Sequence, residues 1–132
     1  MPRLSIPVQK VIQLPSKDDH ILKAEGNETF ASTITPTNQT QIDWTLVILF
    51  YAAVHYVEAY LAKYLGLHLR RHTTRDQYIG KEANLKKIFA PYGHLKFFGY
   101  NARYELYGFT AKDTQDALTY LTEIKNHIIP LL

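Results

Sequence analysis

The stretch from Trp44 to Leu65 constrains the fold most, because it is the longest apolar stretch of the chain. Its apolar residues recur at three- and four-residue steps, the periodicity of an α-helix, and others occupy the remaining faces. His55, Glu58 and Lys63 lie inside the stretch, which favours a central packed helix over a membrane span. The stepped residues are Ile42, Leu46, Leu49, Phe50, Ala53, Val54, Val57 and Leu61, and the other faces carry Trp44, Val47, Ile48 and Tyr51.

Capping signals divide the chain into further helices. A hydroxyl residue three positions before an acid is the capping-box pattern, in which each side chain bonds a free backbone N–H at the helix start. Pro91 suits the first turn of a helix, and Gly66 and Gly108 suit the ends of the helices before them. The three boxes are Ser16 with Asp19, Thr73 with Asp76, and Thr110 with Asp113. The predicted helices span about 16–32, 38–65, 74–89, 91–107 and 111–129.

These helices predict an all-α fold, an antiparallel bundle of four to five helices, because the connections between consecutive helices are short. A length of 132 residues suits a single domain, with residues 16–132 in the bundle. Residues 1–15 hold three prolines, which exclude a helix and predict an extended arm along the bundle, a short hairpin or a segment that packs on a second subunit. The last helix supports the bundle with one apolar side, formed by Ala117, Leu121, Ile124 and Ile128.

Composition excludes several classes of function. The chain has no cysteine, which removes disulfides, thiolate metal sites and cysteine nucleophiles and suits a cytoplasmic location. No signal peptide is apparent at the N-terminus. The six glycines are not clustered and no Gly-x-Ser-x-Gly sequence occurs, so phosphate-binding loops and serine hydrolases are set aside. We expect no cofactor and no membrane partner.

Positive charge is concentrated in the middle of the chain. Residues 63–103 hold nine Lys and Arg against two Asp and Glu, whereas both flanking segments carry more acids than bases. Such a segment predicts either a surface for a polyanion or a solvated helix face. At its end, Lys96, Tyr100 and Arg103 are followed by Tyr107 at helical steps, a pattern that suits phosphate contact with base stacking.

That stripe also has a plainer interpretation. It fits an amphipathic helix whose tyrosines cover the surface and whose arginine pairs with a glutamate. The opposite side of the same helix is expected to face the core. It is formed by Tyr92, Leu95, Gly99, Ala102 and Leu106.

A second polar stripe lies on the central helix, where Tyr51, His55 and Glu58 share one face. A histidine and a carboxylate on a buried helix suit acid–base chemistry or metal binding, or else the histidine is simply satisfied by a neighbour in the bundle. Further metal ligands would have to come from His68, His72 or His94, and no His-Glu-x-x-His or Glu-x-x-His motif is present. Arg70 and Arg71 beside the first two of these histidines oppose a bound cation.

The segment from Phe50 to His55, with its aromatic-Tyr-Ala-x-x-His pattern, resembles the HEPN superfamily of prokaryotic helical bundles. Residues 68–75 and 101–104 resemble one branch of it, and the likeness covers residues 16–130. The resemblance implies a four- or five-helix bundle that forms a homodimer. Many members are metal-independent ribonucleases of toxin–antitoxin or defence systems, and others are binding modules or partners of nucleotidyltransferases.

In the active members of that superfamily an arginine lies four to six residues before a histidine. No arginine of this chain is followed by a histidine at that spacing. A variant site remains open, with His55 as the acid or base and with Arg103 and either Arg75 or His72 holding the phosphate.

The leading hypothesis is a HEPN-like, cytoplasmic homodimer that engages RNA or a nucleotide-bearing partner through its basic middle third, with ribonuclease activity left open. The residues expected to bind RNA are Arg70, Arg71, Lys96, Tyr100 and Tyr107, with Tyr51 and Glu58 in support. One alternative is a non-catalytic interaction module, either an antitoxin or a nucleotidyltransferase partner. A second is a bundle that binds a metal or small ligand through His55 and Glu58.

Overall fold

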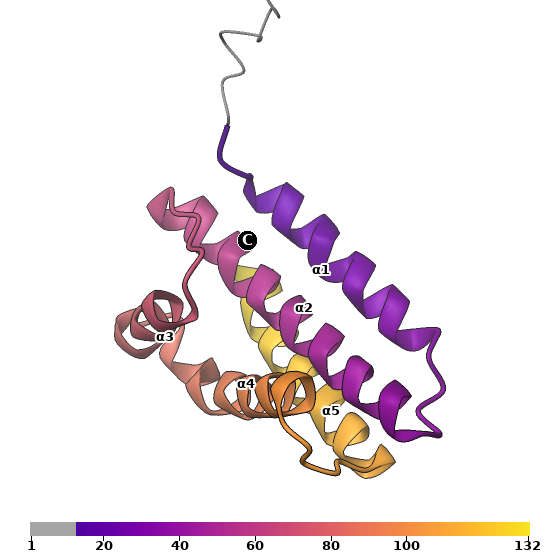
Figure 1. Ribbon diagram of the computed structural model, residues 1–132. Helices are drawn as coiled ribbons and strands as arrows, with labels where there is room; N and C mark the ends of the chain where they lie inside the picture. Colours follow the sequence, from indigo (N-terminus) through magenta and orange to yellow (C-terminus); the bar gives the residue numbers. More distant parts are fainter. Residues whose placement is uncertain (1–12) are drawn as a thin grey trace, which may run out of the picture.

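The computed structural model describes residues 13–132, which are helical without any strand (Figure 1). This confirms the predicted all-α class. The arm expected over residues 1–15 lies outside the described residues except for its last three. The helices are α1 (Lys17–Ser32), α2 (Gln39–Leu65), α3 (His72–Lys81), α4 (Phe89–Tyr104) and α5 (Ala111–Ile128), with short 3₁₀ helices η1 (Lys86–Ile88) and η2 (Ile129–Leu131).

Helix α2 is the centre of the bundle and contacts α1, α4 and α5 (Figure 1). The α1 and α2 helices run antiparallel, joined by a short loop. Helix α5 runs in the same direction as α2, because Gln39 at the start of α2 donates to the Phe109 carbonyl before α5, and Tyr64 near its end donates to the Leu131 carbonyl after α5. Every stepped residue predicted for the cores of α2 and α5 is buried. On the other faces of α2, Val47 is buried, Ile48 and Tyr51 are partly buried, and Trp44 is 51% exposed.

Helix α2 is also the one described helix long and apolar enough to cross a membrane, by length and composition alone. Of its most apolar window, 78% is buried inside the bundle. A core helix of a bundle passes the same test of length and apolarity. The central packing expected from the sequence is therefore what residues 13–132 show.

Three helix ends follow the sequence signals. Ser16 and Thr110 form capping boxes with the acids three residues later, at the starts of α1 and α5. Gly66 ends α2 in the left-handed conformation, with φ of 63°, which a residue without a Cβ adopts at little cost. A further box was not expected: Asn38 caps α2 together with Gln41, because an amide side chain can supply the same acceptors as a hydroxyl and an acid.

The predicted box at Thr73 is wrong. Helix α3 begins at His72 with Arg71 as its N-cap and no side-chain cap. Asp76 pairs instead with Lys96 on α4, a tertiary contact that local spacing does not reveal. The same helix ends at Lys81 rather than near residue 89, because the chain turns there and η1 follows, which brings Leu85 into the core.

Helix α4 is also shorter than expected, since it ends at Tyr104 instead of near residue 107. Leu106, predicted to face the core, is fully exposed, whereas Phe109 is buried and packs against Phe98 with ring centroids 5.3 Å apart. The chain leaves the helix early and buries Phe109 in place of Leu106. Gly108, with φ of 75°, turns this loop and does not end the helix.

Candidate functional site

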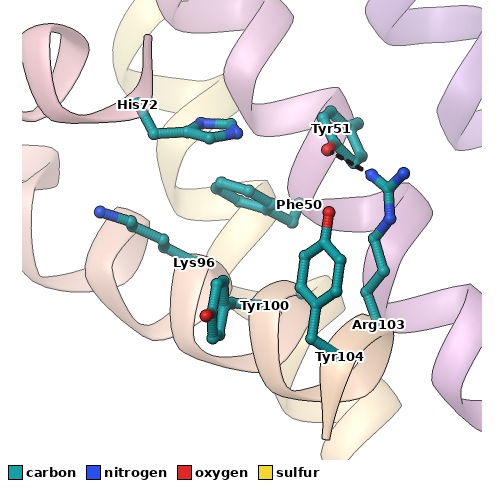
Figure 2. A pocket seen from close by; sticks show the side chains of 8 residues that line it. Phe50, Tyr51, His72, Lys96, Tyr100, Arg103 and Tyr104 are labelled. Atoms are coloured by element: carbon teal, nitrogen blue, oxygen red, sulfur yellow. Dashed lines mark hydrogen bonds between the residues drawn. The ribbon is translucent and has the colours of Figure 1, made fainter.

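An open pocket of about 290 Å³ lies between α2 and α4, with the first residue of α3 at its edge (Figure 2). Its walls combine aromatic rings with cationic side chains. The lining residues are Phe50, Tyr51, His72, Lys96, Gly99, Tyr100, Arg103 and Tyr104. The structure thus brings together five residues singled out in the sequence: Tyr51, His72, Lys96, Tyr100 and Arg103.

The close approach of α4 to α2 builds this pocket. Gly99 sits directly against Phe50, and a Cβ placed on Gly99 would lie 2.7 Å from the Cβ of Phe50, which is closer than such atoms approach. Only a glycine lets the two backbones come together at this point. The buried Phe50 ring then lies 5.5 Å from both the Tyr51 and the His72 rings, measured between centroids. These contacts fix the inner wall of the pocket.

Arg103 is exposed at the pocket and is held by a hydrogen bond, in which its Nη1 donates to the Tyr51 hydroxyl at 2.9 Å (Figure 2). Its guanidinium carbon lies 5.2 Å from the centroid of the Tyr104 ring. Within residues 13–132 no carboxylate pairs with Arg103, so the glutamate pairing considered from the sequence is not what the structure has there. Nη1 is used for positioning, and the other donors of this exposed side chain have no hydrogen-bond partner within residues 13–132.

His72 and Lys96 add two further donors. Burial lowers the pKa of His72, the neighbouring Arg75 and Lys96 lower it further, and Asp76 opposes them, so the ring is neutral at pH 7. Nη1 of Arg75 lies 2.9 Å from Nδ1 of His72. Because a guanidinium can only donate, Nδ1 accepts and the proton of the neutral ring sits on Nε2. His72 therefore offers an N–H donor, and its basic nitrogen is already occupied.

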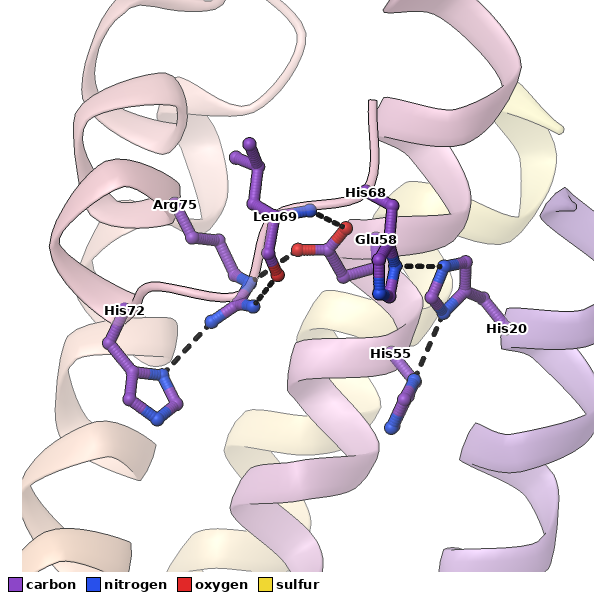
Figure 3. Close-up of polar contacts among 7 residues, drawn as sticks. All are labelled: His20, His55, Glu58, His68, Leu69, His72 and Arg75. Atoms are coloured by element: carbon purple, nitrogen blue, oxygen red, sulfur yellow. Dashed lines mark hydrogen bonds and ion pairs between the residues drawn. The ribbon is translucent and has the colours of Figure 1, made fainter. Parts of the chain in front are cut away.

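Arg75 lies beside His72, and its hydrogen-bond donors are all used within the protein (Figure 3). Only 3% of it is exposed. Its Nε donates to Glu58 at 2.8 Å, and its Nη2 donates to the Leu69 carbonyl at 2.6 Å. Every nitrogen of the guanidinium thus has a partner within the protein, and a phosphate would have to displace these contacts.

The stripe of Tyr51, His55 and Glu58 separates into three environments. Tyr51 faces the pocket, whereas His55 faces α1, where its Nδ1 lies 3.0 Å from Nδ1 of His20 (Figure 3). Glu58 is 1% exposed and accepts from Arg75 and from the backbone N–H of Leu69. The structure does not bring His55 to the pocket that Arg103 lines.

The environment of His55 disfavours the charged form of its ring. Its pKa falls to about 4, first because of burial and then because His20, Lys23, Arg75 and His68 lie near it. Among the described residues, the side chains close enough together to bind one metal ion are His20, Glu58 and His68. Glu58 therefore lies with these two histidines, and not with His55 as the sequence had suggested.

The remaining predicted binding residues lie outside the pocket. Arg70 and Arg71 are exposed in the segment that leads into His72. Tyr107 lies beyond the end of α4 and stacks on Phe109, with ring centroids 4.6 Å apart. The stripe on α4 therefore contributes three of its four members to the pocket, since the helix stops before the fourth.

Sequence reasoning missed two features of this region. Tyr104 lines the pocket, and its place directly after Arg103 in the Asn-Ala-Arg-Tyr segment was the available signal. His20 is the second, at 2% exposure. It lies on the buried side of α1 with Ala24 and Ala31. Ala24 follows His20 by four residues and Ala31 follows Ala24 by seven, a helical spacing that was the available signal for the face packed on α2.

No protein-family model, curated protein or solved structure matches this chain. The resemblance to the HEPN superfamily therefore stays a prediction. Residues 13–132 form a five-helix all-α bundle with a cationic, aromatic pocket beside its central helix.

Proposed function

We propose that the pocket between α2 and α4 binds single-stranded RNA, with a phosphate on Arg103 and a base stacked on the tyrosines. The observation that carries the proposal is the state of Arg103: it is exposed, oriented by Tyr51, and has no carboxylate partner in residues 13–132. A guanidinium held in this way presents a fork of donors that matches a phosphate.

The aromatic lining supports a nucleotide over a bare anion. Tyr100 and Tyr104 are largely exposed, and their ring centroids lie 5.2 Å apart along α4. Exposed tyrosine rings beside a cationic groove form a stacking platform, worth about 1–3 kcal/mol per base in single-strand binders. Arg70 and Arg71, which directly precede His72, extend the positive charge from the pocket edge, as a polymer with several phosphates requires.

The protonation of the pocket supports binding over cleavage. Cutting RNA through its 2′-hydroxyl needs a base that accepts the hydroxyl proton. The accepting nitrogen of His72 is occupied by Arg75, and the pocket lining otherwise presents donors and phenols. We therefore propose an RNA-binding module. A HEPN-like identity stays part of this proposal, supported by the all-helical fold and by the residues of the Phe50–His55 signature. The resemblance implies the homodimer, and the absence of cysteine suits the cytoplasm.

Fluorescence anisotropy with a short labelled single-stranded RNA tests the proposal. We expect Arg103→Gln to bind at least about tenfold more weakly than the unmodified protein, which corresponds to the loss of about 1.4 kcal/mol of charged hydrogen bonding. The matched control is Lys112→Gln, which removes one positive charge from the exposed side of α5, where Lys112 pairs with Asp116. Equal affinity in Arg103→Gln and Lys112→Gln would contradict the proposal.

The same RNA, incubated with the protein in EDTA and resolved on a gel, separates binding from cleavage. We expect it to stay intact. Cleavage that His72→Ala loses would instead identify a metal-independent ribonuclease at this pocket. RNA that neither binds nor breaks would favour the protein-interaction module.

A further inference from the structure

We propose that His20, Glu58 and His68 form a binding site for a divalent transition-metal ion of the zinc class. One ligand atom from each of these residues lies within 4.8 Å of the others. They come from α1, α2 and the loop after α2, respectively (Figure 3). The site is independent of the proposed RNA pocket, whose lining contains none of the three.

The spacing of the two imidazoles fits a shared metal. Nε2 of His20 lies 3.3 Å from Nδ1 of His68. Two nitrogens bound to one tetrahedral zinc at about 2.0–2.1 Å lie roughly 3.4 Å from each other. Both nitrogens are thus placed at the separation that neighbouring ligands of one ion have.

The second nitrogen of His20 has the partner that a metal-binding histidine needs. With Nε2 on the metal, Nδ1 carries the proton, and it lies 3.0 Å from Nδ1 of His55. Histidine ligands almost always donate their other N–H to a fixed acceptor, which holds the ring in orientation and raises its basicity. His55 is therefore a positioning residue for His20, and this gives a role to a histidine that the pocket does not use.

Glu58 supplies the oxygen ligand. Its Oε1 accepts from Arg75 at 2.8 Å, and its Oε2 accepts from the Leu69 N–H at 3.0 Å. Each carboxylate oxygen has two acceptor directions, so both hydrogen bonds can persist while one oxygen binds a metal. Ligating carboxylates are commonly fixed by such hydrogen bonds.

The donor set selects the class of cation. Two imidazoles and one carboxylate suit zinc and its first-row neighbours, whereas magnesium and calcium need a shell of oxygens. Arg75 offsets the charge of Glu58, so the imidazoles carry most of the binding, which again disfavours the hard cations. His20 and Glu58 are buried and His68 is partly exposed, so the ion would enter from the side of His68 and keep a coordination position for water.

Isothermal titration of the full chain with zinc, after removal of metal by EDTA and dialysis, tests the site. We expect one zinc per chain and no such binding in His20→Gln or in His68→Gln. The controls are His94→Gln and His127→Gln, which change histidines that stack on Tyr120 and bond the Asn84 carbonyl, outside the cluster. Both controls should bind one zinc as the unmodified protein does.

A positioning role of His55 has its own signature. His55→Gln should keep the stoichiometry of one zinc and lower the affinity by about 10–100-fold, the usual effect of losing an outer partner. Cobalt(II) used as a probe should give the visible absorption of a four-coordinate ion in the unmodified protein. His68→Gln should lose that absorption.

Folding of each variant is checked by circular dichroism and by its melting temperature. If His20→Gln does not fold, His68→Gln carries the test, because His68 is partly exposed in a loop. Zinc should raise the melting temperature of the unmodified protein and of His94→Gln but not that of His68→Gln. The proposal is overturned if zinc does not bind, or if His68→Gln binds it as tightly as the His94→Gln control.

Discussion

Arg75 and Arg103 each bond a residue that lines the pocket, His72 and Tyr51, and they use their charge in opposite ways. Arg75 is buried and directs all its nitrogens at Glu58, His72 and the Leu69 carbonyl. Arg103 is exposed and uses one nitrogen on the Tyr51 hydroxyl. An arginine with every donor satisfied inside the protein stabilises the fold, and one that is oriented but unsatisfied is available to a ligand. Burial and partners, and not residue type, separate the two roles.

The largest predicted effect is on folding and belongs to Arg75. Arg75→Ala leaves the carboxylate of Glu58 buried without its partner, which typically costs about 3–5 kcal/mol. Arg103→Ala should change the free energy of unfolding by no more than about 0.5 kcal/mol, as surface substitutions do. Urea denaturation followed by circular dichroism measures both. Similar losses of unfolding free energy in the two variants would show that the two arginines do not differ in their role in the fold.

The next effect concerns how closely α4 approaches α2. Gly99→Ala forces a Cβ into Phe50 and should cost about 1–3 kcal/mol as well as weaken RNA binding, because the pocket wall must move. The matched control is Gly93→Ala on the same helix, where nothing lies within 4 Å of the new Cβ.

At Gly93 the added methyl should stabilise the helix by about 0.5–1 kcal/mol. Thermal and urea unfolding of both variants checks the pair. If Gly99→Ala is as stable as Gly93→Ala, the close contact with Phe50 does not exist.

RNA affinity should also depend on pH through His72. The groups near its ring are Arg75 and Asp76 on α3, Lys96 on α4, and the rings of Phe50 and Tyr51 on α2. Because the pKa of His72 is below its usual 6.5 or so, the ring is neutral at pH 7 and gains a positive charge only as the pH falls below that value. Affinity should be flat from pH 8 to about 6.5 and rise below it.

Stability changes with pH in the opposite direction to RNA affinity. The unfolded chain protonates this histidine first, so the stability contributed by the neutral ring is present above about pH 6.5 and is lost as the pH falls from there toward the lower pKa of the folded ring. Anisotropy titrations at several pH values, with His72→Gln as the control, check the binding curve. A rise of equal size in His72→Gln would assign it to another group.

The smallest effect is expected from the exposed pair before α3. Arg71→Gln should weaken RNA binding only a few-fold, since one flexible exposed charge contributes less than an oriented one. Arg70→Gln should behave alike. A loss as large as that of Arg103→Gln would move the centre of the interface from the pocket to this loop.

The core was predictable because it depends on periodicity within single helices. The stepped residues of α2 and α5 define their buried faces without any knowledge of their neighbours. The ends of α3 and α4 were not, because tertiary contacts decide them. Asp76 looks like a capping acid but pairs with a lysine twenty residues away, and Phe109 displaces Leu106 from the core.

In the candidate site, too, the features set by spacing within one helix could be predicted and those set by tertiary packing could not. Lys96, Tyr100 and Arg103 could be grouped from their helical spacing, and the structure adds His72 and Tyr51 to them. The separation of His55 from this group, and its contact with His20, could not be predicted, since they depend on which side of α2 receives α1. Helical spacing predicts which residues share a face, but which neighbouring helix contacts that face depends on the tertiary packing.

The salt dependence of RNA binding tests the central claim most directly, that Arg103 is an oriented phosphate donor. The logarithm of the association constant is plotted against the logarithm of salt concentration for the unmodified protein, Arg103→Gln and Lys112→Gln. Each lost phosphate contact should reduce the slope by about 0.7 for a single strand. We expect that reduction in Arg103→Gln and an unchanged slope in Lys112→Gln. An unchanged slope in Arg103→Gln would show that Arg103 does not contact a phosphate.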